Sequence, residues 1–258
     1  MAGAALLTDP LFYAACIPAV LLFGIAKGGF GGALGVAAVP LMALVMSPVQ
    51  AAGILLPILC LMDLLSLWAY RGKWVWPELK SLLPASLLGI LAGTLLFGYM
   101  SANAVKLVIG IVAIVFTSHH FLTQMKKSAA KPSYLSPGYG VVGGTVAGFT
   151  SFIAHAGGPP LSMYLLRRPL NRTEFVATSV VFFTVVNYVK LVPYGWLGQL
   201  ASDNLMASLI LAPFAPIGVK LGVWLHNNVS DRIFFRFVYL LLFIVALKLI
   251  SDGLGVFS

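Results

Sequence analysis

The sequence predicts an all-α integral membrane protein built from two inverted repeats, and three observations support this fold class. Of the 258 residues, 60% are hydrophobic and 9% are charged, whereas a soluble domain carries roughly 25% charged residues. The apolar residues form runs, several of which have about the length that a membrane-spanning helix needs. The order of runs in the first half of the chain returns in the second half. Two cysteines are also too few for a small disulfide-linked protein.

The first repeat is expected over residues 1–122. It opens with a broken helix pair, 11–46, in which two apolar runs, 11–26 and 33–46, flank the glycine-rich segment 28–32. At about 1.5 Å of rise per residue neither run crosses a bilayer comfortably, so a re-entrant hairpin and two full short crossings both remain open. Three spanning helices are predicted to follow, over 50–70, 81–99 and 104–122.

A polar stretch, 123–137, is expected to form a cytoplasmic linker to the second repeat, 138–258. Residues 155–160 interrupt a second broken pair, 138–166, at the place where glycines interrupt the first pair. Three further spanning helices are predicted, over 173–192, 204–222 and 233–251.

The two halves align in three blocks, and the offset between them grows only in the loops, from 120 to 124 and then to 129 residues. In the first block His155 stands opposite Gly35. Three blocks in the same order indicate an internal duplication. The blocks pair Gly28 with Gly148, Asp63 with Asn187, and Gly89 with Gly218.

The basic residues favour an inverted arrangement of the two repeats. If each broken pair enters and leaves on one side, most Lys and Arg residues lie on one face, and the opposite face keeps Lys106, Lys190 and Lys248 at helix ends. The positive-inside rule then makes the basic face cytoplasmic and places both termini on the other side. The residues on the basic face are Arg71, Lys73, Lys80, Lys126, Lys127, Lys131, Arg167, Arg168, Arg172, Arg232 and Arg236.

The two breaks predict a site for an anion. A break at membrane depth is tolerated where it is buried in protein or lines a wet cavity, and paired breaks in inverted repeats build the midplane sites of secondary transporters. The half-helices expected near Ala33 and Pro160 would direct their positive N-terminal ends at the centre. Glycines leave the backbone amides open to close approach. The candidate glycines are Gly28, Gly29, Gly31, Gly32, Gly157 and Gly158.

Two side chains at the breaks are candidates for binding the anion. Lys27 directly precedes the first glycine run, at a depth where a cation is expensive, although a lysine there could also extend to the interface. His155 lies in the second break and could donate to the anion, carry a proton or cap the half-helix. Ser151 could add a hydrogen bond.

Polar residues inside the spanning helices complete the candidate site. Asp63 is expected to carry a proton or to be the counter-ion of Lys27, and its counterpart Asn187 binds substrate or joins helices. Lys190, one turn beyond Asn187, either faces the pathway or extends outward, and Lys220 is expected to extend outward. Small-residue pairs predict helix contacts at Gly89, Gly93, Gly218 and Gly222.

No catalytic residue, metal or cofactor is expected. Cys16 and Cys60 lie in apolar runs without a CxxC partner, and the adjacent His119 and His120 point in different directions on a helix. The sequence contains no P-loop and no HExxH motif. The formal charge of +9 arises mainly from loop residues, so the expected partners are the lipid bilayer and a small anion, and nucleic acid is not among them.

The segments KGGFGG at 27–32, which leads to Pro40-Leu41, and GGPPL at 157–161 resemble the sulfite exporter TauE/SafE family. The resemblance covers nearly the whole chain and rests on glycine and proline patterns. It implies a secondary carrier of sulfite or sulfonate-type anions in a bacterial inner membrane, and it maps the glycine-rich breaks of the family onto 28–32 and 155–158.

We therefore expect a secondary transporter, an exporter by resemblance, that works by alternating access. Asp63 or His155 would couple transport to protons. The alternative is a cation- or proton-conducting channel or carrier that uses Asp63 as the ion ligand. A membrane-embedded enzyme is not expected.

Overall fold

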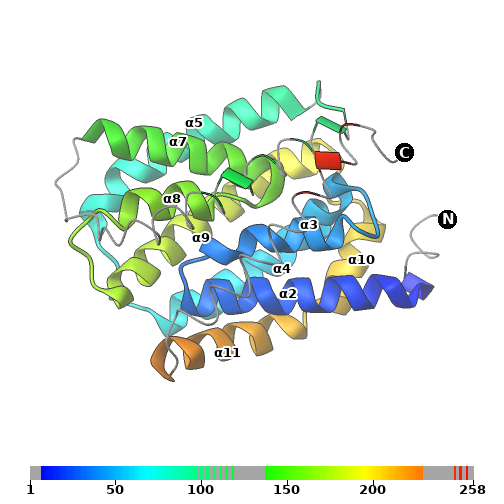
Figure 1. The fold of residues 1–258 in the computed structure, drawn as a ribbon, viewed down its shortest axis with the longest axis horizontal. Helices are drawn as coiled ribbons and strands as arrows, with labels where there is room; N and C mark the ends of the chain where they lie inside the picture. The colour runs from blue at the N-terminus through cyan, green and yellow to red at the C-terminus, as the bar shows by residue number, and fades with distance from the viewer. Residues whose placement is uncertain are drawn as a thin grey trace.

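The computed structural model describes residues 7–97 and 137–228, with scattered residues between 99 and 118 and at 247, 250, 251 and 254. Every regular element in this part of the chain is a helix, and most of the helices lie side by side along the long axis (Figure 1). The predicted linker 123–137 and most of the predicted helices 104–122 and 233–251 fall outside the described residues. In chain order the elements are α2 (Pro10–Gly29), η1 (Ala33–Ala37, a 3₁₀ helix), α3 (Ala38–Met42), α4 (Pro48–Ala69), α5 (Trp76–Phe97), α7 (Pro137–Ala154), α8 (Gly158–Leu165), α9 (Arg172–Trp196), α10 (Ser202–Leu211) and α11 (Phe214–Asn228).

Four of the described helices are long and apolar enough to cross a membrane. They are α2, α4, α5 and α9, with 20, 22, 22 and 25 residues. A bent pair, α10 and α11, becomes a fifth candidate if it is counted as one span. These helices confirm the all-α membrane class predicted from composition.

The first break lies further along the chain than the apolar runs predicted. α2 begins at an Asp9 cap that accepts a hydrogen bond from the Leu11 amide, and it continues through Lys27 and the next two glycines to Gly29. The glycines do not stop the helix because each packs against α11, so close that a Cβ atom would overlap its backbone. α2 is therefore long enough to cross the membrane alone, and the break proper is Phe30–Gly32.

The helix predicted over 204–222 is in fact two helices. α10 ends at Leu211 and α11 begins at Phe214, with an angle of 48° between them. Pro213 lies between the two helices. Because proline has no backbone N–H and its ring clashes with the preceding turn, the helix bends there.

Glycines hold two helix pairs in close parallel contact, α2 against α11 and α5 against α7. A Cβ at Gly218 would lie 3.0 Å from the Cα of Gly24, and one at Gly93 would lie 2.8 Å from the Phe152 ring. The contacts made by Gly89 and Gly222 are similarly close to the partner backbone. The predicted helix contacts at these small residues are confirmed.

Helices α4 and α9 run antiparallel through the centre of the molecule. Tyr70, just after α4, packs against Val176 and Val180 near the start of α9. At the opposite end, a Cβ at Gly53 of α4 would lie 2.6 Å from the Gln199 carbonyl oxygen, just after α9.

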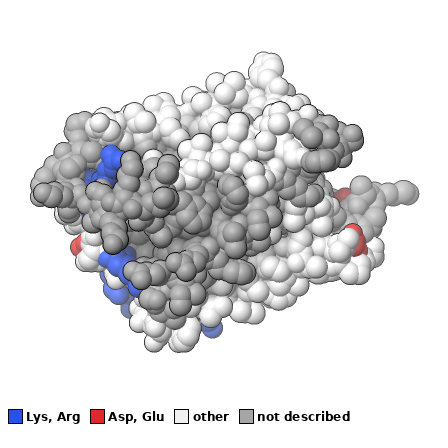
Figure 2. Space-filling model, viewed as in Figure 1, with Lys and Arg blue, Asp and Glu red and all other residues white. Residues whose placement is uncertain are grey.

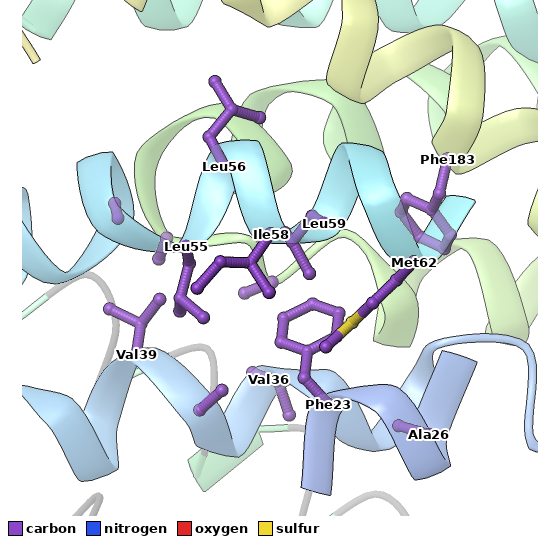
Figure 3. Packing of buried hydrophobic residues seen from close by; sticks show 14 of the residues in the cluster. Phe23, Ala26, Val36, Val39, Leu55, Leu56, Ile58, Leu59, Met62 and Phe183 are labelled. Atoms are coloured by element: carbon purple, nitrogen blue, oxygen red, sulfur yellow. The ribbon is translucent and has the colours of Figure 1, made fainter. Parts of the chain in front are cut away.

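The apolar core lies between α4 and the first broken pair. In Figure 3, Phe23 of α2 and Val39 of α3 point toward α4. They meet its Leu55, Leu59 and Met62 side chains. This packing fixes the end of α2 against the middle of α4, where the candidate site residues lie.

The described Lys and Arg side chains gather mainly at one end of the molecule (Figure 2). This is the end at which α2 and α4 finish and α9 begins, away from the N-terminus (Figure 1). Arg71 and Lys73 follow α4 there, and Arg167 and Arg168 lie in the α8–α9 loop. Lys80 lies in the first turns of α5, and Arg172 is the first residue of α9. The other five predicted members of this basic face, at 126, 127, 131, 232 and 236, lie outside the described residues.

Candidate functional site

The two breaks have the same backbone geometry. After α2 the Gly32 amide donates to the Ala26 carbonyl at 2.9 Å, and after α7 the Ala156 amide donates to the Thr150 carbonyl at 3.1 Å. The residue before each of these amides is left-handed, with φ of 63° at Gly31 and 51° at His155. Each helix thus ends in the same backbone cap, in which an amide donates to the carbonyl six residues earlier.

The shared cap corrects the alignment of the first block. The cap places His155 opposite Gly31, where the sequence alignment had placed it opposite Gly35. In the same way Gly148 now stands opposite Gly24, where the sequence alignment had paired it with Gly28. The offset before the break is therefore 124, the same as in the following helix. Four additional residues after the first break, where η1 forms, explain why a glycine-matched alignment slipped by one helical turn.

A tyrosine at the end of the next long helix of each half binds the broken helix at an equivalent carbonyl. The Tyr70 hydroxyl donates to the Gly28 carbonyl at 2.5 Å, and the Tyr194 hydroxyl donates to the Phe152 carbonyl at 2.6 Å. The two donors, Tyr70 and Tyr194, are 124 residues apart, and so are the two acceptors, Gly28 and Phe152. These bonds satisfy carbonyl groups near the C-terminal ends of α2 and α7, which the helices leave without partners.

Lys27 is buried in an ion pair. Its side chain is 2% exposed, and Nζ lies 2.5 Å from Oδ1 of Asp63 and donates to the Leu59 carbonyl at 3.2 Å. The other oxygen of Asp63 accepts a hydrogen bond from Asn187 at 2.8 Å. The structure therefore does not extend Lys27 to the interface, and it joins the equivalent residues Asp63 and Asn187 directly.

Lys190 forms a second buried cluster, with Ser151 and His155. Its residue is 0% exposed, so it lies neither outward nor on the opposite face where the charge count placed it. Nζ lies 2.9 Å from the Ser151 carbonyl oxygen, 3.0 Å from the Ser151 hydroxyl oxygen and 2.8 Å from Nδ1 of His155. All three contacts are to atoms that can accept, which suits the three donors of an ammonium group.

The hydrogen bonds of His155 set its charge. Nε2 lies 2.9 Å from the Ala52 carbonyl oxygen, which can only accept, so Nε2 carries the proton. Nδ1 then accepts from Lys190, because a second ring proton would point at the ammonium group. If Lys190 is an ammonium group, this pair of side chains holds one positive charge.

A small cavity joins the two clusters. Its volume is about 10 Å³, which is roughly the room for one water molecule. Both breaks contribute to its wall, through Gly32 and His155. The full lining is Phe23, Lys27, Gly32, Leu59, Ser151, His155, Phe183 and Asn187.

The remaining predicted glycines lie outside this wall. Gly28 and Gly29 form the α2–α11 contact, and their amides belong to the helix. Gly31 faces Phe175 and Ser179, and Gly157 packs against α7. Gly158 is the first residue of α8, whereas the first break is followed by a 3₁₀ helix.

The sequence interpretation missed two aromatic residues, Phe23 and Phe183. A Cβ at Gly32 would lie 3.2 Å from the Phe183 ring, and one at Gly157 would lie 3.0 Å from it, so this ring sits between the breaks. One signal was available in the sequence. Phe183 precedes Asn187 by four residues, and residues at that spacing share a helix face.

No group of three or more His, Cys, Asp or Glu side chains that could hold a metal lies within the described ranges. Both cysteines are buried and free of disulfides. His119 and His120 fall outside the residues that the structure describes.

Comparison with known proteins gives a family for this architecture. The chain is similar to the "Probable sulfite/organosulfonate exporter TauE" of Cupriavidus necator, with 26% identity over 133 residues, which are 52% of either chain. The match thus spans about half the length of that relative. No solved structure gives a significant match. Residues 16–249 match the family described as "Sulfite exporter TauE/SafE". Because this match covers most of the sequence, the chain belongs to the sulfite exporter TauE/SafE family.

Proposed function

We propose that this protein is a secondary transporter that exports a small sulfur-containing anion, such as sulfite or an organosulfonate. The anion binds in the cavity between the two helix breaks. The observation that carries the proposal is a pair of buried lysines beside a cavity lined from both breaks. Lys27 lines the cavity, and Lys190 contacts Ser151 and His155, which line it. Buried cations inside a membrane protein are costly and mark the path of a substrate or ion.

The size of the cavity supports transport by alternating access. A volume of about 10 Å³ is too small for a sulfur atom with three oxygens, so the site is closed in this conformation. Binding requires the lining residues to separate. The lining comes from α2, α4, α7 and α9, so rocking of the two halves about the crossing of α4 and α9 opens the site to either side.

The contacts of Asp63 do not favour the alternative function, a cation channel or carrier. Its two carboxylate oxygens contact Lys27 and Asn187. A cation ligand would have to displace a lysine that is already paired with it. His155 is the better candidate for proton coupling, because it lines the cavity and its imidazole can take up a proton in the states from which the anion has left.

For the orientation in the membrane, we propose that the basic end of the molecule is cytoplasmic, that the membrane is a bacterial inner membrane, and that both termini lie on its other side. The gathered Lys and Arg side chains support this orientation. The matched caps and tyrosine bonds support a duplicated chain, and we propose that the duplicates are inverted.

The test is flux of labelled sulfite and of a labelled sulfonate in proteoliposomes of the purified protein. We expect saturable flux with the wild-type chain and a large loss with Lys27→Ala. Lys220→Ala is the matched control, because Lys220 is an exposed lysine of α11, and it is expected to leave flux unchanged. Absence of saturable flux of either anion from wild-type protein would remove the proposed function.

Proton coupling has its own test. An imposed pH gradient without a substrate gradient should drive accumulation in the wild-type protein. His155→Gln keeps a donor for the Ala52 carbonyl but cannot take up a proton, and it should exchange anions without responding to the gradient. A gradient response that persists in this variant would exclude His155 as the coupling residue.

A further inference from the structure

The two buried lysines differ in their counter-charges. Lys27 contacts the Asp63 carboxylate at 2.5 Å, so this pair carries no net charge. Lys190 contacts a carbonyl, a hydroxyl and a neutral imidazole. Among the described residues no carboxylate lies within 4.0 Å of its amine.

The groups that face Lys190 come from three other helices. α2 contributes Lys27, α4 contributes Cys60 and Asp63, and α7 contributes Ser151, while His155 comes from the break that follows α7. Asp63 is bound to the other lysine and to Asn187, and its negative charge is balanced there. With His155 neutral, a charge count over these groups gives two lysines and one carboxylate, which leaves one positive charge beside the cavity.

Burial makes this excess charge informative. An ammonium group taken out of water loses several kcal/mol of solvation, which hydrogen bonds to neutral groups return only in part. A single negative charge in the cavity would neutralise it. A dianion would leave one excess negative charge in the same buried space.

Resting on the proposed function, we infer that Lys190 is the cation that binds the transported anion, and that the site takes a monoanion. Sulfonates and hydrogensulfite belong to this class, whereas sulfate and fully ionised sulfite do not. Lys27 and Asp63 then serve as a neutral pair that positions Asn187 at the cavity wall. The anion takes the place of the Ser151 and His155 acceptors at Lys190.

Methanesulfonate and sulfate make a matched pair of probes. Both have a tetrahedral sulfur with oxygens, and one carries a single charge where the other carries two. Binding of each probe to purified protein is measured by calorimetry at one fixed pH. We expect methanesulfonate to bind wild-type protein at least about tenfold more tightly than sulfate. Tighter binding of sulfate would overturn the inference that the site takes a monoanion. This comparison uses wild-type protein alone and needs no variant.

Two variants separate the lysines. Lys190→Gln should weaken methanesulfonate binding by about 30-fold or more, since it removes the buried charge. The double variant Lys27→Gln with Asp63→Asn keeps the net charge, and it should weaken methanesulfonate binding by only about threefold, against about 30-fold for Lys190→Gln. If the double variant loses as much affinity as Lys190→Gln, the anion is held by Lys27 and the assignment fails.

A third variant tests the charge count directly. Asp63→Asn alone adds one positive charge, and it should shift the preference toward sulfate by about tenfold or more. An unchanged preference would contradict the charge argument. Failure of the proposed function is distinguishable, because wild-type protein would then show no saturable flux of any of these anions.

Discussion

The two helix breaks share a scaffold but differ in chemistry. Both end in the same backbone cap with a left-handed residue, and each is bound by a tyrosine from the following long helix. The lysine, however, lies on the broken helix in the first half and on the long helix in the second. Lys27 of α2 faces Asp63, and Lys190 of α9 faces Ser151 of α7.

The difference can be followed position by position. The offset of 124 places Ser151 at the position of Lys27, and Lys190 at the position of Ser66. Each half therefore supplies one lysine to the centre, from different helices. Among the residues that the structure describes, only the first half also supplies a carboxylate at the crossing of α4 and α9. The two halves thus share a hydrogen-bonded frame, while their charges at the crossing are unequal.

The largest expected effect is on stability, at the first break. Lys27→Gln leaves the Asp63 carboxylate buried without its cation, and it should lower the free energy of unfolding by about 3–5 kcal/mol. Lys190→Gln leaves behind only neutral acceptors and should cost about 1–3 kcal/mol. Unfolding in mixed micelles measures both values.

The same comparison has an internal control. Adding Asp63→Asn to Lys27→Gln removes the stranded charge, so most of the lost stability should return. If Lys190→Gln proved the more destabilising of the two single variants, the first break could not be regarded as the one held by an ion pair.

The second prediction asks whether the scaffold is equally tight in both halves. A Cβ at Gly148 would overlap the Ser86 backbone, and one at Gly24 would lie 2.8 Å from the Cα of Gly218. Gly148→Val and Gly24→Val should each destabilise the protein by about 1–3 kcal/mol through overpacking. Gly195→Ala, with nothing within 4 Å of its Cβ, should be neutral or slightly stabilising. Tolerance of valine in one half alone would show that the helix pairs are not equivalent.

The smallest effect is expected from the tyrosines. Tyr70→Phe and Tyr194→Phe each remove one hydrogen bond to a carbonyl at the end of a broken helix, and each should cost about 1 kcal/mol. The two costs should agree within about 0.5 kcal/mol if the bonds are equivalent. A larger gap, measured by thermal unfolding in detergent, would limit the shared scaffold to the backbone cap.

Much of the site could be predicted because buried polar residues are rare in so apolar a chain. Lys27, Asp63, His155 and Asn187 were selected on that ground, and the structure brings them together within two adjoining clusters. Asp63 was expected as a proton carrier or as the counter-ion of Lys27, and the contact fits the second of these.

Other features could not be predicted, for physical reasons. Glycine in a sequence marks either a break or a close helix contact, and Gly28 and Gly29 proved to be contacts. The alignment slipped by four residues because matching glycines outweighed the left-handed backbone that Gly31 and His155 share. Phe183 was missed because phenylalanines are common in this chain, and only the packing shows which ring stands between the breaks.

The ring of Phe183, between Gly32 and Gly157, limits how much water the cavity can hold, and this affects leakage of charge across the membrane. Each charge that leaks across a membrane held at 100 mV dissipates about 2.3 kcal/mol, so an idle carrier must be an insulator. With the ring in place, the cavity has room for about one water molecule, too little for a chain of waters that could conduct protons. Between the two breaks, the described part of the molecule in this conformation therefore holds no chain of waters along which protons could pass.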